Sequence, residues 1–183
     1  AQLIACHEHN EKAVIGRILS HLEAGQMVGL CSDAGYPLIS DPGYPLVRAV
    51  IDAGYEISVI PGPSAICIAL ISSGLPPSSF TFKGFLPRKP GARRKTLVQE
   101  LHSEHTLIFY ESSYRITKTL KEMLEIYGDR KAALCLELTK QFERVERGRL
   151  SELLQNCENK KIKGEAVIVV APEKFQCNTS DLN

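Results

Sequence analysis

Short apolar runs alternate with Pro- and Gly-rich loops and helical patterns in the first third of the chain, and this order limits the possible folds. Residues 27–31 (MVGLC) and 56–60 (EISVI) have the length and apolar content of buried strands. Each run is followed by a loop and then by a helical pattern, at 45–54 and at 65–74. Because parallel strands need crossover connections, we predict an α/β fold with a parallel-rich first sheet.

The rest of the chain predicts a second, mixed sheet. The segment 72–80 is rich in Ser, Gly and Pro, so we expect two α/β domains, at 1–76 and 77–183. Candidate strands lie at 80–85, 106–111, 131–138, 142–150 and 165–171, and candidate helices at 93–102, 113–127 and 150–157. Two strands follow one another directly around 131–150, which indicates an antiparallel hairpin.

Composition restricts the classes of partner and compartment. Lys and Arg total 22 against 21 Asp and Glu, so the net charge of +1 does not by itself indicate a polyanionic partner. The six Cys include no close pair, and Cys31, Cys67 and Cys135 lie in apolar runs as buried side chains would. No apolar run reaches the roughly 20 residues of a membrane helix. We therefore expect a cytoplasmic protein with no membrane partner.

The segment 29–47, GLCSDAGYPLISDPGYPLV, is a candidate ligand loop. It leaves the predicted strand 27–31 at its carboxyl end, where ligands of parallel sheets bind, and PGPSA (61–65) leaves the next strand in the same way. Backbone amides in both loops could bind an anionic or zwitterionic group, and Asp33 could accept hydrogen bonds. Tight turns with capping side chains are the alternative. Neither loop has a GxxxxGK[ST] or GxGxxG pattern, which disfavours nucleotide triphosphates and nicotinamide cofactors.

Two polar segments invite further readings. RKPGARRK (88–95) has five basic residues in eight, which is typical of a flexible loop that grips phosphates or of a solvated surface loop. HEHNE (7–11) lacks the HExxH spacing of a zinc site, so we expect no metal and interpret it as a substrate contact or a helix cap.

A series of motifs then indicates a family. In chain order they are SDAGYPLISDPG, PGPSA, SGLP, FKGFLPRKPGARR, TLIFYESSYRI, ELTKQFE and RGRLSEL. They cover nearly the whole chain and strongly resemble the ribosomal RNA small-subunit methyltransferase I family of the tetrapyrrole methylase-like superfamily. The resemblance implies S-adenosylmethionine-dependent 2'-O-methylation of a cytidine ribose in small-subunit (16S) ribosomal RNA. It also implies a cofactor cleft between two α/β domains, and a homodimer.

The resemblance carries site residues with it. The positions that match the family's cofactor-binding motifs are Ser32, Asp33, Ala34, Gly35, Pro37, Leu38, Ser64, Ala65, Tyr110, Glu111, Gly164 and Ala166. With the family placement, the basic segment becomes an RNA contact through Arg88, Lys89, Arg93, Arg94 and Lys95. A ribose hydroxyl is a poor nucleophile while protonated, so a general base would help, and Asp33, Glu111 and His9 are the candidates.

The chain departs from the family pattern in two informative places. Family members usually begin with a strand and a TPIGNL-like loop, which do not precede LIACHEHNEK here, so we expect an N-terminally truncated chain. Tyr36 stands where Thr is common, which raises the question of whether it crowds the cleft. The alternatives are a tetrapyrrole (precorrin-like) methyltransferase, with the same fold and cofactor, and a non-catalytic RNA-binding fragment.

Overall fold

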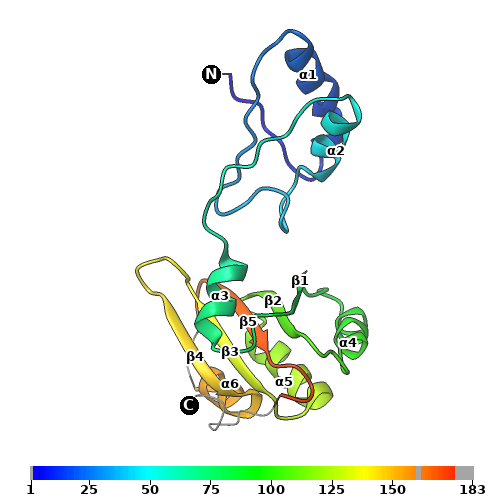
Figure 1. Ribbon diagram of the computed structural model, residues 1–183. Helices are drawn as coiled ribbons and strands as arrows, with labels where there is room; N and C mark the ends of the chain where they lie inside the picture. The colour runs from blue at the N-terminus through cyan, green and yellow to red at the C-terminus, as the bar shows by residue number, and fades with distance from the viewer. Residues whose placement is uncertain (1, 160–161, 176–183) are drawn as a thin grey trace. The chain divides into compact units, whose positions relative to one another are not determined.

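The chain forms two compact units, residues 1–64 and residues 65–183 (Figure 1). The computed structural model describes residues 2–159 and 162–175. The expected domain boundary at 76/77 lies after α3 (Ala65–Ser73), a helix that packs on the sheet of the second unit. The division into domains at 1–76 and 77–183 stays a prediction.

The first unit is built on two amphipathic helices, and the second of them confirms the helical pattern predicted at 45–54. They are α1 (Glu11–Glu23) and α2 (Tyr44–Asp52). Ile18 of α1 packs with Leu46 and Val50 of α2 in a small buried cluster. The backbone N–H of Gly43, at the start of α2, donates to the Glu11 carboxylate at 2.9 Å, which ties the two helices together.

The two strands expected in the first unit are a wrong prediction. Residues 27–31 and 56–60 form no strand, and the described part of this unit contains none. Most of their apolar side chains lie open to solvent, with Met27 99% exposed and Ile60 84% exposed. A strand exists only through hydrogen bonds to a neighbour, and among the described residues neither segment has one. Cys31 is exposed as well, and so is Cys67 in α3, whereas Cys135 is buried as expected.

The second unit carries the predicted mixed sheet. Its strands are β1 (Phe80–Phe85), β2 (Thr106–Ser112), β3 (Lys131–Leu136), β4 (Arg144–Arg149) and β5 (Glu165–Val170), in the spatial order β1-β2-β5-β3-β4. β1 and β2 are parallel, and every other neighbouring pair is antiparallel. The antiparallel pairing of β3 with β4 confirms the predicted hairpin.

Helices cover both faces of this sheet. α3 lies on one face, while α4 (Pro90–Gln99), α5 (Ile116–Tyr127) and α6 (Leu150–Glu158) contribute to the core on the other (Figure 1). Successive strand residues point to opposite faces, so Leu107 and Phe109 of β2 join the larger core and Ile108 joins the smaller one. Within residues 2–159 and 162–175, no helix combines the length and the apolar character that a membrane span requires.

Candidate functional site

The two Pro- and Gly-rich loops of the first unit contact each other. The backbone N–H of Gly62 donates to the Tyr36 hydroxyl at 2.8 Å. The backbones of the two loops also lie close together at Gly35, where an added Cβ would lie 3.7 Å from the Pro63 carbonyl oxygen. The two loops are therefore joined directly, and Tyr36 supplies the link. The shorter Thr that is common here in the resembling family would not carry its hydroxyl to the same place.

Tyr36→Phe is expected to loosen this junction without unfolding the unit. It removes one hydrogen bond to an amide that water can reach, so the loss is about 1 kcal/mol and exchange of the Gly62 amide hydrogen accelerates about fivefold. NMR-detected hydrogen exchange measures this rate. Tyr44→Phe, at a 68% exposed tyrosine of the same unit, is the control. An unchanged rate in Tyr36→Phe would show that the bond does not form in solution.

The backbone of the first loop adopts an unusual conformation. Leu38 and Ser40 have φ angles of 70° and 62°, a region that residues other than glycine seldom adopt. Gly35 has φ 74°, and the Ser32 hydroxyl donates to its carbonyl at 3.0 Å. Such strained conformations persist where surrounding contacts fix them, and they concentrate at binding sites. The loop therefore has a specific conformation that its own contacts hold in place, as expected of a binding loop.

Asp33 and His9 are the two exposed candidates for a general base. In the part of the chain that the structure describes, no hydrogen bond or ion pair occupies the Asp33 carboxylate. The exposed His9 ring meets the His7 ring edge to face, at 6.2 Å between centroids. Both groups are open to a ligand.

The Asn10 side chain holds the HEHNE segment in its conformation. Its side-chain oxygen accepts from the His7 backbone N–H at 2.7 Å, and its amide group donates to the Ala5 carbonyl at 3.0 Å. The segment is thus a closed turn at the start of α1. Among the described residues, no group of three potential metal ligands comes together.

Four predicted residues of the second unit gather at one end of its sheet. Glu111 of β2 lies opposite Ala166 of β5, with Tyr110 next to it. Gly164 precedes β5 with φ +86°, and a Cβ there would lie 2.1 Å from the Glu137 carboxylate. Glycine suits this position, because the backbone angle would strain any other residue and a Cβ would displace the Glu137 side chain. Glu137 itself was not predicted.

Glu111 is a buried anchor rather than an available base. It is 1% exposed, and one carboxylate oxygen accepts from Arg115 Nε at 2.6 Å and from the Ser112 N–H at 2.8 Å. The other oxygen accepts from the Thr119 hydroxyl at 2.7 Å. A general base must reach the proton that it removes, and both oxygens already hold α5 to β2. The structure therefore corrects this assignment and gives Glu111 a positioning role.

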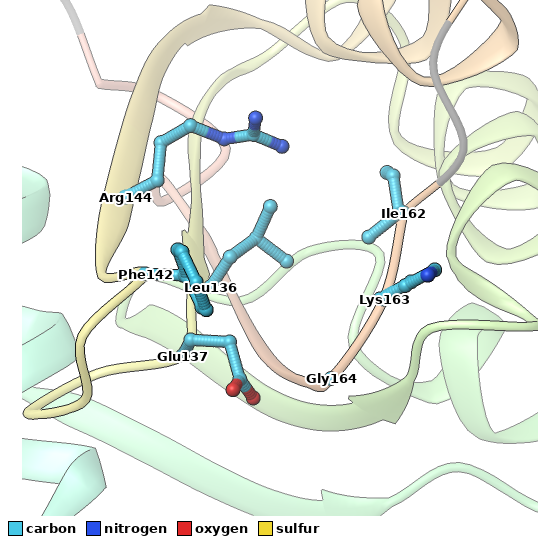
Figure 2. Close-up of a pocket in the computed structure, with 7 residues that line it drawn as sticks. All are labelled: Leu136, Glu137, Phe142, Arg144, Ile162, Lys163 and Gly164. Atoms are coloured by element: carbon cyan, nitrogen blue, oxygen red, sulfur yellow. The ribbon is translucent and has the colours of Figure 1, made fainter.

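A cavity of about 250 Å³ adjoins the same end of the sheet. Figure 2 shows its lining residues, Leu136, Glu137, Phe142, Arg144, Ile162, Lys163 and Gly164. Glu137 accepts from the Glu165 backbone N–H at 2.7 Å and from Lys140 at 3.3 Å, and these bonds lower the pKa of its carboxyl. The cavity is below the roughly 300–1,000 Å³ of most ligand pockets, so alone it suits only part of a ligand. Its unpredicted members come from separate segments that only the folded sheet brings together.

The basic segment 88–95 is a helix start, which corrects the flexible-loop prediction. α4 begins at Pro90, a residue whose fixed φ suits the first helical turn. Arg93 is 2% exposed and forms a bidentate pair with Glu122, with both N–O distances 2.6 Å. Its guanidinium is therefore not available to RNA. The four exposed members of the segment are Arg88, Lys89, Arg94 and Lys95.

Comparisons with known proteins agree with this architecture. A sequence model of the Tetrapyrrole (Corrin/Porphyrin) Methylases matches residues 4–154. Proteins called Ribosomal RNA small subunit methyltransferase I are 50% identical over 172 residues in Xylella fastidiosa (strain Temecula1) and 46% identical over 168 residues in Streptococcus pyogenes serotype M3. The alignments cover 92% of this chain but 63% and 58% of those proteins. The chain thus spans about three fifths of the length of these relatives.

Solved structures share the fold at low sequence identity. The methyltransferase CobJ aligns with a TM-score of 0.65 at 20% identity, over 88% of this chain and 71% of CobJ. Cobalt precorrin-4 methyltransferase, CbiF, aligns with a TM-score of 0.59 at 19% identity, over 87% of this chain and 70% of CbiF. With the family match over residues 4–154 and the mixed five-stranded sheet, the chain belongs to the tetrapyrrole (corrin/porphyrin) methylase family, as its motifs predict.

Proposed function

We propose that this chain is part of an enzyme that methylates small-subunit (16S) ribosomal RNA at the 2'-hydroxyl of a cytidine ribose, with S-adenosylmethionine as methyl donor. The observation that carries the proposal is the identity of 46–50% with proteins called Ribosomal RNA small subunit methyltransferase I, over 92% of the chain. The cytidine and the 2'-oxygen come from the family resemblance. A homodimer acting in the cytoplasm belongs to the same proposal.

The first loop fits such a cofactor chemically. The ammonium and ribose hydroxyl groups of S-adenosylmethionine are donors, and Asp33 offers an exposed carboxylate with no partner among the described residues. Ser32, Ala34, Gly35, Pro37 and Leu38 form the shaped backbone around it, and Ser64 and Ala65 follow the loop that Tyr36 ties down. Tyr110, Gly164 and Ala166 are proposed contacts on the second unit.

The reaction needs alignment more than it needs acid–base chemistry. S-adenosylmethionine would supply a methyl group bonded to a positively charged sulfur. As the ribose oxygen bonds to the methyl carbon, the carbon–sulfur bond would break and the sulfur would leave as a neutral thioether. The hydroxyl must be held in line with that carbon, and positioning of this kind supplies much of the acceleration. The hydroxyl proton must go to a base as the bond forms. Asp33 and His9 are exposed, so they remain the proposed candidates.

Exposed cations of the second unit are the proposed RNA contacts. Arg88 and Lys89 precede α4, and Arg94 and Lys95 lie on its first turns. Lys and Arg on phosphates fix the position of an RNA chain without reading its sequence. We therefore propose that these side chains contribute to the affinity for RNA, which weakens as salt increases, and that they do not select the nucleotide.

Methyl transfer to small ribosomal subunits is the test of this function. The full chain is incubated with S-adenosylmethionine labelled in its methyl group and with subunits that lack the modification. We expect label in the RNA, at a cytidine whose 3'-phosphodiester resists alkali because the 2'-hydroxyl that would attack it is blocked. Label in a porphyrinoid but not in RNA would contradict the proposal in favour of a tetrapyrrole methyltransferase. Absence of cofactor binding in calorimetry would favour a non-catalytic RNA-binding fragment.

A further inference from the structure

Three aromatic rings lie together at the β1 edge of the second unit's sheet. β1 stands first in the strand order, with β2 beside it. The Phe82 ring of β1 meets the Tyr110 ring of β2 edge to face, at 4.7 Å between centroids. The Phe85 ring meets the same Tyr110 ring edge to face at 5.4 Å. We call these three residues the aromatic cluster.

A β-bulge in β1 places Phe85 in this cluster. Phe82 pairs with Ile108 of β2. Three positions further along β1, Phe85 pairs with Tyr110, which is two positions further along β2. Paired residues point to the same face of a sheet, whereas residues three apart in a regular strand point to opposite faces. The extra residue beside Gly84, which has φ 63°, therefore turns Phe85 onto the face of Phe82.

The cluster offers an open apolar surface. Phe85 is 56% exposed, and Phe80, two positions before Phe82 and on the same face, is exposed as well. An edge-to-face contact with one neighbour leaves at least one face of the Phe85 ring uncovered by that neighbour. Neighbouring exposed apolar side chains mark binding surfaces, and β-bulges are common where a side chain is aimed at a partner. The position of Phe85 therefore indicates a partner with a flat apolar surface.

Cations next to the cluster indicate which partner fits. Arg88 and Lys89 follow Phe85 by three and four positions, and both side chains are exposed. Neither side chain forms an ion pair within the described residues. The Arg88 carbonyl accepts from Arg93 Nη1 at 3.3 Å, which ties the backbone of this segment to α4. A second copy of the same face would bring like charges together, whereas a polyanion with flat rings complements both the cations and the cluster.

We propose that the aromatic cluster is a stacking site for an unpaired base of an RNA chain, with Phe85 as the stacking ring and with Arg88 and Lys89 on the phosphates beside that base. The proposal rests on the proposed function, because it takes RNA as the substrate. Single-stranded nucleic acids are bound by this combination of aromatic rings and cations. Stacking accepts any base but requires that the base be unpaired. The cluster therefore selects single-stranded RNA, which contacts to phosphates alone do not.

Binding of labelled RNA to the full chain tests the stacking ring. Phe85→Ala is expected to weaken binding of single-stranded RNA by about 5- to 100-fold, the value of one base stacked on an aromatic side chain. The loss should be equal at all salt concentrations because the ring is uncharged, whereas Lys89→Ala should reduce the salt dependence. Tyr114→Ala, at a 96% exposed tyrosine outside the cluster, is the matched control and should bind as the wild type does.

A tryptophan at position 85 reports stacking directly. The sequence contains no Trp, so Phe85→Trp has a single indole. An indole also stacks on bases, so we expect this variant to keep the affinity of the wild type. Its fluorescence should be quenched by single-stranded RNA and change little with double-stranded RNA. The fluorescence of Tyr114→Trp, the matched control, should change little with either.

The proposal is overturned if Phe85→Ala binds single-stranded RNA as tightly as Tyr114→Ala, or if RNA leaves the fluorescence of Phe85→Trp unchanged. It is also overturned if Phe85→Ala turns a dimer into a monomer in sedimentation, because a second copy then covers the ring. Methyl transfer to small ribosomal subunits distinguishes these results from failure of the proposed function. A wild type that methylates the RNA, together with a Phe85→Ala variant of full RNA affinity, would exclude the stacking site alone.

Discussion

Asp33→Ala is expected to weaken S-adenosylmethionine binding by about 10- to 100-fold, the value of one or two hydrogen bonds to a charged acceptor. The carboxylate is exposed and has no partner among the described residues, so its removal disturbs no protein contact. The surrounding loop keeps its shape through Ser32 and through the link between Tyr36 and Gly62. Calorimetry measures the affinity, and methyl transfer to small ribosomal subunits should fall at least as far.

Asp41→Ala is the matched control for this prediction. Asp41 is an exposed carboxylate in the same loop, eight positions after Asp33 and outside the residues proposed for the cofactor. Its replacement removes the same charge from the same loop, so it reports the general electrostatic effect alone. We expect near-wild-type affinity. Equal losses in both variants, or full affinity and turnover in Asp33→Ala, would contradict the role assigned to Asp33.

The elements of the second unit could be predicted because local pattern and final packing agree there. In β2 the alternate residues Leu107 and Phe109 join one core and Ile108 joins the other, so the apolar run corresponds to a strand buried on both faces. Similarly, α5 buries Leu120 and Met123 one turn apart. Burial of this kind can be predicted from the spacing of apolar residues in a short stretch of sequence. The order of the strands, by contrast, depends on contacts between segments far apart in the sequence. One example is the position of β5 between β2 and β3, which no short stretch of sequence reveals.

The failures share one physical cause, which is dependence on contacts that form only when the chain folds. Residues 27–31 and 56–60 have strand composition, but composition does not supply the neighbouring backbone that a strand requires. Arg93 and Glu111 look like available charges in the sequence. In the fold both are buried in ion pairs: Arg93 meets a carboxylate 29 positions away, and Glu111 meets Arg115 where α5 follows β2. The loop at Asp33 was predictable because Gly and Pro fix its shape locally.

Arg93→Ala is expected to destabilise the second unit by about 3–5 kcal/mol, because it leaves the part-buried Glu122 carboxylate without its counter-charge. The Glu122 side chain is only 16% exposed, so water cannot replace the lost guanidinium fully. Urea unfolding of the full chain measures the change. Arg94→Ala is the control, since Arg94 is 58% exposed and 3.5 Å from an equally open Glu125. Exposed pairs of this kind contribute about 0–1 kcal/mol.

Unfolding measured at low pH distinguishes loss of the Arg93–Glu122 ion pair from loss of packing as the cause of the destabilisation. The hydrogen bond from Arg93 lowers the pKa of Glu122 below its ordinary value of 4.5 in the folded chain. The pair's stabilisation is therefore present above that ordinary value and is lost as the pH falls through the lowered pKa. The stability difference between the wild type and Arg93→Ala should shrink over that range. A difference that persisted in strong acid would point to packing instead of charge.

Stability and RNA affinity should also respond in opposite ways at these two neighbouring arginines. Arg93→Met combined with Glu122→Leu removes both buried charges and keeps apolar volume, so it should recover most of the stability lost in Arg93→Ala. RNA affinity should then equal that of the wild type, because the buried Arg93 does not reach a phosphate. Arg94→Ala should instead weaken RNA binding, reduce its dependence on salt and leave stability nearly unchanged. Weaker RNA binding in the stable double variant would return Arg93 to the RNA contacts predicted from the sequence.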